Sequence, residues 1–168
     1  ATVSGNRSLD NNSITSLVSI GKCGLQYLKG EREVMEVKLS YNGPWFEATN
    51  SRGAMIKMGA NSEQVVSPME ALLMAAGGCS GIDIVGMLEK MRQPMTGLEI
   101  TVSGERRQEH PRYFQSILIK YVLQGKVDAD KAKRAIELSL EKYCSVTNSL
   151  APKVVIKYEL EIEEDDEL

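Results

Sequence analysis

The chain has 168 residues, of which 42% are hydrophobic, so it is long enough for one well-buried domain and too short for two comfortable ones. Its formal net charge is −3, and most of the acidic excess lies in the final segment from Glu159 onwards, which we expect to be a solvated strand edge that continues into an acidic tail. This balance excludes the strongly basic surface of a nucleic-acid-binding protein, and no nucleic-acid partner is predicted.

Three widely separated cysteines, Cys23, Cys79 and Cys144, do not form the framework of a secreted disulfide-rich protein. They are typical of a reducing compartment and predict a cytoplasmic location. A metal site would need all three cysteines together with His110 at unrelated spacings, so we expect neither a metal nor a cofactor. We interpret Cys23 as an incidental thiol and His110 as an exposed loop residue.

The N-terminal residues 1–31 are rich in Ser, Asn and Gly and differ from the rest of the chain. They are open to interpretation as a processed, a partly disordered or an artificially added segment. Residues 32–168 then form the single predicted domain. This domain begins with three short strands joined by two strong turn signals, which predicts an antiparallel meander over residues 34–41, 45–49 and 54–58.

The stretch from Ser67 to Arg92 predicts a long central helix. Ser67 is a good N-cap, Pro68 suits the first helical position, and Glu70 completes a capping box. The rest of the stretch is apolar on nearly every side, which is typical either of a core helix or of a membrane span. Because the apolar run is short and lacks aromatic anchors, we favour the core helix and expect Asp83 to need a buried partner.

After this helix the pattern predicts two long strands, a second helix and a last strand. The second helix begins at an Asp128 N-cap and reaches about Tyr143, with Cys144 at the end of its inward stripe. The order is βββ-α-ββ-α-β, an α+β fold, and the long helix leaves too little sheet to cover it, so we expect a homodimer with a shared core. The predicted elements of this half are strands 98–108, 113–123 and 154–162 and a helix over 128–143. Apolar residues alternate along the second of these strands and share one face of it: Ile117, Ile119, Tyr121 and Leu123.

The two helical cysteines allow two interpretations. Free cysteines usually behave as small buried hydrophobic residues. Reactive chemistry at Cys79 would instead require a thiolate, and Asp83, four residues further along the same helix face, would disfavour it. A reactive Cys79 therefore needs a cation from elsewhere in the protein. The arginines considered for this role are Arg52, Arg92, Arg106 and Arg107.

Family resemblance adds to this interpretation. The segments Ser67–Glu70, Gly77–Ser80 and Ile82–Val85 resemble the OsmC/Ohr family of osmotically inducible and organic-hydroperoxide-resistance proteins, and within it the YhfA-like branch. The likeness spans roughly residues 33–163. It continues in Gly104-Glu105-Arg106-Arg107, His110-Pro111, Leu138-Ser139 and Glu141-Lys142-Tyr143-Cys144-Ser145-Val146.

The resemblance implies an intertwined homodimer and a thiol peroxidase acting on organic hydroperoxides in oxidative stress defence. Cys79 resembles the peroxidatic cysteine, Cys144 resembles the resolving cysteine, and an external dithiol would reset the pair. One departure is that Met69 stands where the peroxidase branches have a carboxylate. Glu70, one residue later, is either the capping partner of Ser67 or a displaced catalytic carboxylate.

The alternative function is a non-enzymatic dimer. Such a dimer would bind a small apolar ligand between its helices, or would sense redox state through the same two cysteines. A third hypothesis, acyl transfer by Cys79, lacks an identifiable base. In each case we expect small molecules and a second copy of the chain as partners, and no membrane.

Overall fold

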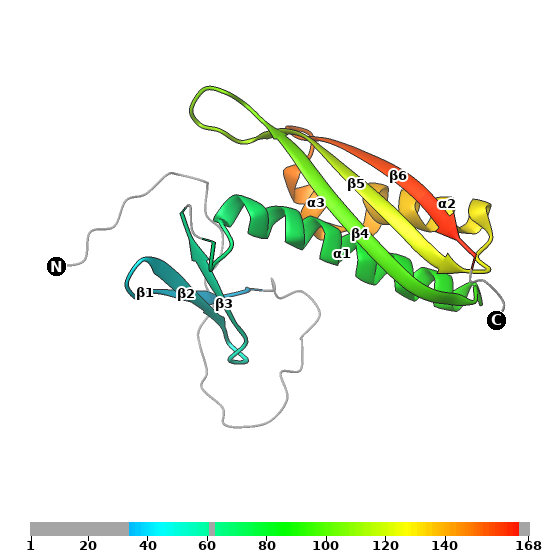
Figure 1. Cartoon of the computed structure of the whole chain (residues 1–168), viewed down its shortest axis with the longest axis horizontal. Coiled ribbons are helices and arrows are strands. Elements are labelled where there is room, and N and C mark those ends of the chain that lie inside the picture. The colour runs from blue at the N-terminus through cyan, green and yellow to red at the C-terminus, as the bar shows by residue number, and fades with distance from the viewer. Residues whose placement is uncertain (1–33, 61–62, 165–168) are drawn as a thin grey trace, which may run out of the picture. The chain divides into compact units, whose positions relative to one another are not determined.

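The computed structural model describes residues 34–60 and 63–164. The chain divides into two compact units, Ala1–Met35 and Glu36–Leu168, and the helices and strands described below lie in the second. They form two three-stranded sheets and a long helix, followed by a shorter interrupted helix (Figure 1). The α+β class and the predicted element order are confirmed.

The first sheet is an antiparallel meander in the order β1-β2-β3, with strands Val37–Tyr41, Trp45–Asn50 and Met55–Gly59. Gly43 and Gly53 lie in its turns with φ of 79° and 84°, a backbone region that favours glycine. The predicted meander is confirmed, although β1 begins at Val37 rather than at residue 34. Many large apolar side chains of this sheet are exposed in the single chain: Val37, Leu39, Tyr41, Phe46, Met55 and Ile56.

The long helix α1 spans Pro68–Lys90 and begins as the sequence predicts. The Ser67 Oγ accepts a hydrogen bond from the Glu70 N–H at 3.2 Å, and the Glu70 Oε2 accepts one from the Ser67 N–H at 2.7 Å. The backbone hydrogen bond from Ser67, followed by its side-chain bond, lowers the pKa of Glu70. Glu70 is therefore the capping partner of Ser67, as one of the two interpretations proposed.

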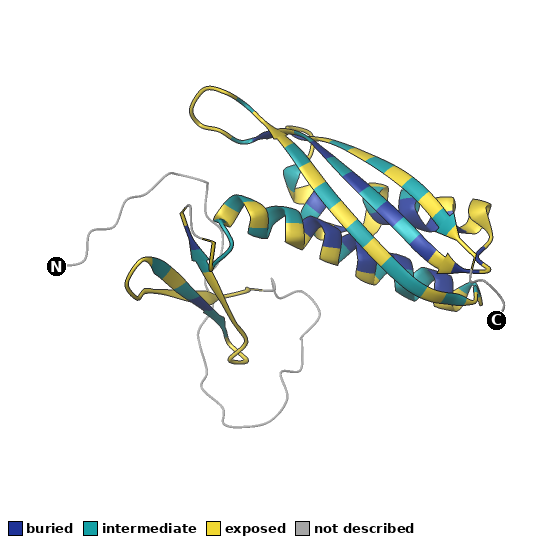
Figure 2. Ribbon diagram, viewed as in Figure 1, coloured by how far each residue is buried: buried dark blue, intermediate teal, exposed yellow. Residues whose placement is uncertain are grey.

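The second sheet has the order β4-β5-β6, with strands Met95–Arg106, Phe114–Gly125 and Val155–Glu163. β4 and β5 are antiparallel, whereas β5 and β6 are parallel. Alternate residues of β5 are buried, and Figure 2 shows this alternation along the strand. The predicted inward face of this strand is confirmed, because four of its side chains are fully buried: Ile117, Ile119, Tyr121 and Leu123.

The second predicted helix is interrupted before it reaches the second cysteine. It consists of α2 (Ala129–Leu138), the π-helical turn η1 (Ser139–Tyr143) and the short helix α3 (Ser145–Leu150). Asp128 caps α2 through a hydrogen bond from the Lys131 N–H. A continuous helix to Tyr143 was expected, but the 3.6-residue pattern cannot reveal a wide turn, because Ser139 still falls on the inward stripe.

By length and composition, α1 is the one helix in residues 34–60 and 63–164 that could cross a membrane. A core helix has the same composition, and α1 does pack against a sheet. Ile84 and Leu88 are fully buried on one side of it and join the main core. The interpretation as a core helix fits this packing.

Candidate functional site

The two helical cysteines are free thiols that lie next to each other across two elements. Cys79 is in the middle of α1 and is partly exposed, whereas Cys144 follows η1 and is fully buried. Burial is the main cause that raises the pKa of the Cys144 thiol, and the neighbouring Cys79 side chain raises it further, against hydrogen bonds with Thr147 that lower it. The raised pKa keeps Cys144 in its neutral thiol form.

The wide turn η1 places Cys144 opposite α1. The Cys144 N–H donates to the Ser139 carbonyl at 2.7 Å. This bond joins residues five apart, as in a π-helix, whereas the bonds of an α-helix join residues four apart. Cys144 then leaves the helical conformation with φ −66° and ψ 99°, and its carbonyl accepts the side-chain Nδ2–H of Asn148 at 2.9 Å. The backbone on both sides of this thiol is therefore fixed by hydrogen bonds.

Asp83 has the partner that the sequence requires. The Ser139 Oγ donates a hydrogen bond of 2.9 Å to the Asp83 Oδ2. Ser139 is fully buried and Asp83 partly so. Asp83 lies one turn after Cys79 on α1, and the Ser139 carbonyl accepts the Cys144 N–H. The bond between Asp83 and Ser139 therefore connects the helix that carries Cys79 to the turn that positions Cys144.

A second buried hydrogen bond joins α1 to the sheet. The Tyr121 hydroxyl of β5 donates to the Ser80 Oγ at 2.8 Å, and the Ser80 Oγ donates in turn to the Ala76 carbonyl at 3.0 Å. Burial raises the pKa of Tyr121 to about 12, the Ser80 bond opposes the shift, and Cys144 and Asp83 add to it. Ser80 and Tyr121 therefore form a neutral, satisfied polar pair beside Cys79.

No cation meets Cys79 within the described part of the chain. Neither hydrogen bonds nor ion pairs connect it to any of the four arginines considered from the sequence. Arg52 lies in the turn between β2 and β3, Arg92 follows α1, Arg106 ends β4, and Arg107 pairs with Glu109 in the next hairpin.

The remaining sequence candidates lie apart from the cysteine pair. Met69 lines a cavity at the start of α1, and His110 is exposed in the β4–β5 hairpin that borders the same cavity. Cys23 falls outside the described residues. Residues 34–60 and 63–164 contain no group of three or more His, Cys, Asp or Glu side chains placed to hold a metal ion.

An open groove of about 540 Å³ runs beside the elements that carry the cysteines. Its lining combines the α1 turn after Cys79 with the end of α2 and η1, and apolar side chains predominate. The lining residues are Ile82, Asp83, Gly86, Met87, Lys90, Met91, Leu138 and Tyr143.

The fold agrees with a comparison against protein families. The family model described as "OsmC-like protein" matches residues 60–159, which is more than half of the chain. The chain therefore belongs to the OsmC-like family, and the resemblance drawn from its sequence is confirmed.

Individual relatives agree with this assignment. Protein YhfA of Escherichia coli K12 is 43% identical over 122 residues, which covers 71% of this chain and 91% of the relative. The crystal structure of a hypothetical protein from Aquifex aeolicus VF5 has 37% identity and a TM-score of 0.74, and the match covers 80% of this chain and 100% of the other. The organic hydroperoxide resistance protein OhrB of Bacillus subtilis shares the fold with a TM-score of 0.55 and 15% identity, over 77% and 98% of the two chains.

Sequence reasoning missed three polar side chains around the thiols. These are three buried residues: Ser139, Thr147 and Tyr121. Ser139 bonds the Cys144 N–H, Thr147 bonds Cys144, and the Tyr121 hydroxyl bonds Ser80, the residue after Cys79. Thr147 was detectable, because a hydroxyl three residues after a helix N-cap commonly bonds the cap carbonyl, as it does here at 3.2 Å. The contacts of Ser139 and Tyr121 with α1 join distant parts of the sequence, and no local pattern signals them.

Proposed function

We propose that this protein is a two-cysteine thiol peroxidase that reduces organic hydroperoxides in oxidative stress defence. The observation that carries the proposal is the pairing of two free thiols with unequal environments. Cys79 is partly exposed, and Cys144 is buried beside it with a raised pKa. The exposed thiol is the one that a peroxide can reach, so Cys79 takes the peroxidatic role and Cys144 the resolving role.

The reaction proceeds in three balanced steps. The Cys79 thiolate attacks the outer oxygen of the hydroperoxide, the O–O bond breaks, and the products are a sulfenic acid and an alcohol after one proton is taken up. The Cys144 thiol then attacks the sulfenic sulfur, an S–S bond forms, and water leaves. An external dithiol reduces the disulfide and restores both thiols while it becomes a disulfide itself.

The environment of the pair supports an organic substrate. The groove beside Cys79 is lined mainly by apolar side chains such as Ile82, Met87 and Leu138, which would bury an alkyl group of the peroxide. The likeness to organic hydroperoxide resistance proteins of the same family points the same way.

We infer that a second copy of the chain supplies the charge that stabilises the Cys79 thiolate. Two observations support this inference: no cation contacts Cys79 among the described residues, and Met69 occupies the position of the family's carboxylate. The exposed apolar side chains Met74 and Ile82 on α1 favour such an assembly. We therefore infer a homodimer, with a cytoplasmic location that keeps the thiols reduced.

The test is intact-mass analysis of the reduced protein after a stoichiometric pulse of cumene hydroperoxide, with peptide mapping of any crosslink. We expect rapid formation of a disulfide between Cys79 and Cys144. In Cys144→Ser the sulfenic acid should accumulate at Cys79, and in Cys79→Ser the peroxide should be left unconsumed. Thiols that stay reduced in the wild-type protein would overturn the proposal.

The second candidate is a dimer that binds a ligand or senses redox state without turnover. The absence of a cation beside Cys79 among the described contacts favours it, because an unactivated thiol reacts slowly. The two functions separate in a steady-state assay with excess dithiothreitol and hydroperoxide. Continuous peroxide consumption indicates the enzyme, whereas one slow oxidation per chain indicates the sensor.

A further inference from the structure

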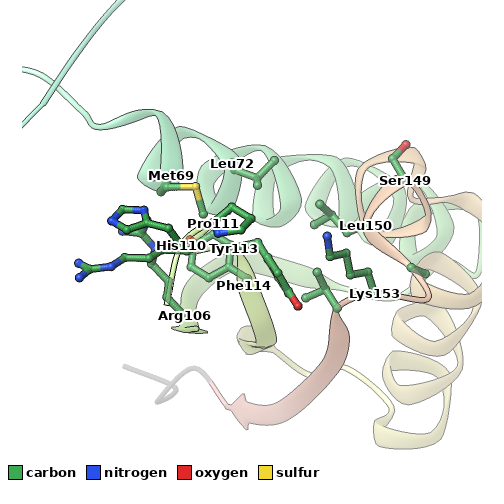
Figure 3. Close-up of a pocket in the computed structure, with 13 residues that line it drawn as sticks. Met69, Leu72, Arg106, His110, Pro111, Tyr113, Phe114, Ser149, Leu150 and Lys153 are labelled. Carbon is green, nitrogen blue, oxygen red and sulfur yellow. Dashed lines mark hydrogen bonds between the residues drawn. The ribbon is translucent and has the colours of Figure 1, made fainter. Parts of the chain in front are cut away.

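A second cavity, of about 610 Å³, lies at the other end of the fold from the α1 C-terminus, between the first turns of α1, the β4–β5 hairpin and the segment that leads into β6 (Figure 3). Its volume is within the range of small-molecule sites in proteins. The inner wall is apolar, with Phe114 and Val154 almost fully buried. Met69, Leu72 and Leu150 complete this apolar wall.

The charged side chains around this wall are all basic. Arg106, Arg112 and Lys153 line the cavity together with His110, and none of the lining residues is acidic. The hairpin's Glu109 pairs with Arg107 instead, outside the lining. The cavity therefore combines an apolar interior with a positive rim, an arrangement that attracts an anion and repels a cation.

The two arginines of this rim are held in place by the protein without being neutralised. The Arg106 Nε donates to the Arg112 carbonyl at 2.9 Å, and the Arg112 Nε donates to the Gln108 carbonyl at 3.1 Å. Among the described residues, no carboxylate pairs with either guanidinium. Each guanidinium therefore keeps N–H donors on its outer nitrogens, the groups with which arginine binds carboxylates.

Lys153 supplies charge at another part of the rim. Its Nζ lies 4.0 Å from the centroid of the Tyr113 ring, a cation–π contact that fixes the ammonium group above an aromatic face. Figure 3 shows Lys153 beside Leu150 and Tyr113, with Arg106 and His110 on the opposite side of Pro111. A ligand that enters between them passes charged groups before it meets the apolar wall.

We propose that this cavity binds an anionic amphipath, a molecule with one carboxylate and an aliphatic tail. The carboxylate pairs with the outer nitrogens of Arg106 and Arg112, and the tail lies against Leu72 and Phe114. Neither Cys79 nor Cys144 lines the cavity, so the inference goes beyond the proposed peroxidase and does not depend on it. Charge and apolar contact act together here, and each should be required for tight binding.

Decanoate is a suitable probe, measured by isothermal titration calorimetry with the reduced full-length Cys79→Ser protein at concentrations below micelle formation. We expect saturable binding at one site per chain that weakens as salt is raised. Decyltrimethylammonium, which has the same tail and the opposite charge, should not bind. The double variant Arg106→Gln with Arg112→Gln should lose about tenfold in affinity, as expected when charge-assisted hydrogen bonds are removed.

The matched control is Arg134→Gln, which removes the same charge from an exposed position of α2 that does not line the cavity. It should bind decanoate as well as the parent protein does, and thermal melts should show that all variants fold. Equal weakening by Arg134→Gln, equal affinity for the cationic amphipath, or binding to anionic vesicles without binding to monomeric decanoate would overturn the proposal. Because the probe carries no peroxide and the parent lacks Cys79, failure of the peroxidase proposal would leave this result unchanged.

Discussion

The two faces of α1 are both apolar, yet only one of them packs against other elements of the described part of the chain. The inward face is fully buried at Ile84 and Leu88, whereas Ile82 and Met74 on the outward face are 77% and 59% exposed. Figure 2 shows the buried and exposed positions alternating along the helix. An exposed apolar face of this kind is typical of a surface that another molecule covers.

Glycines distinguish the two faces as clearly as the large side chains do. A Cβ at Gly81 would lie 2.6 Å from the Ile100 Cδ1, and one at Gly77 would lie 2.8 Å from the Val102 Cγ2. A Cβ at Gly78, on the outward side, would meet nothing within 4 Å. The inward glycines therefore allow α1 to approach β4 closely, whereas Gly78 has no such role in the single chain.

The largest expected effect comes from truncating matched isoleucines on the two faces. Ile84→Ala should lower the free energy of unfolding by about 2–5 kcal/mol, because it leaves a cavity in the core. If no other molecule covers the outward face, Ile82→Ala should change the free energy of unfolding by less than about 0.5 kcal/mol. Urea unfolding of both variants, followed by circular dichroism, measures the two values.

The same pair of variants tests whether a second copy covers the outward face. In a dimer that buries Ile82, the Ile82→Ala variant should be destabilised at concentrations where the parent protein is dimeric, and this loss should shrink as both proteins are diluted into monomers. Analytical ultracentrifugation of both variants provides the control, because Ile84→Ala should not alter association at concentrations where it is folded. Equal and concentration-independent losses would contradict the distinction between the faces.

Alanine in place of glycine should sharpen the comparison with smaller effects of opposite sign. Gly81→Ala forces the Ile100 side chain to shift, and overpacking of this kind costs about 1–3 kcal/mol, offset in part by the better helix propensity of alanine. Gly78→Ala meets open space and should raise the melting temperature, since alanine is favoured over glycine by about 0.5–1 kcal/mol.

Differential scanning calorimetry at several protein concentrations measures both glycine variants. A loss of stability in Gly78→Ala that disappears on dilution would show that a partner chain approaches this glycine closely. A gain in Gly81→Ala would mean that the contact between α1 and β4 is looser than the structure has it.

Local patterns were sufficient to predict much of this fold from the sequence. The capping box at Ser67 and Glu70, the glycine turns of the first sheet and the alternation along β5 depend on residues close together in the chain, and all three are confirmed. The wide turn η1 was not predicted, because Ile136, Leu140 and Cys144 follow one another at the four-residue spacing of a regular helix. Only the backbone bond between Ser139 and Cys144 reveals the extra residue in the turn.

The surroundings of the cysteines were harder to predict than the cysteines themselves. The need for a partner at Asp83 followed from the cost of burying a lone carboxylate, but its identity as Ser139 depends on how α1 meets η1. The basic cavity at the start of α1 was likewise hidden. Its cations come from the β4–β5 hairpin and the segment before β6, which are distant in sequence.

A smaller effect than that of core truncation concerns the polar bond on the inward face of α1. Tyr121→Phe removes the hydrogen bond to Ser80 and should cost about 1 kcal/mol at neutral pH, because the Ser80 hydroxyl still donates to the Ala76 carbonyl. Its clearer signature is the alkaline pH dependence. Burial raises the pKa of Tyr121 from an ordinary value of 10 to about 12, so the fold favours the protonated phenol. The resulting stability is complete below pH 10 and is lost as the pH rises towards 12.

Urea unfolding between pH 9 and about 12 should therefore show a steeper loss in the parent protein than in Tyr121→Phe. Other groups, including the lysines, titrate in the same range, but they contribute equally to both proteins, so the difference between the two curves isolates Tyr121. Tyr41→Phe is the control, because Tyr41 lies in the other sheet and its side chain is 73% exposed. Parallel curves for the parent and Tyr121→Phe would mean that this phenol is open to solvent, and that the inward face of α1 is less tightly closed beside Cys79 than its packing indicates.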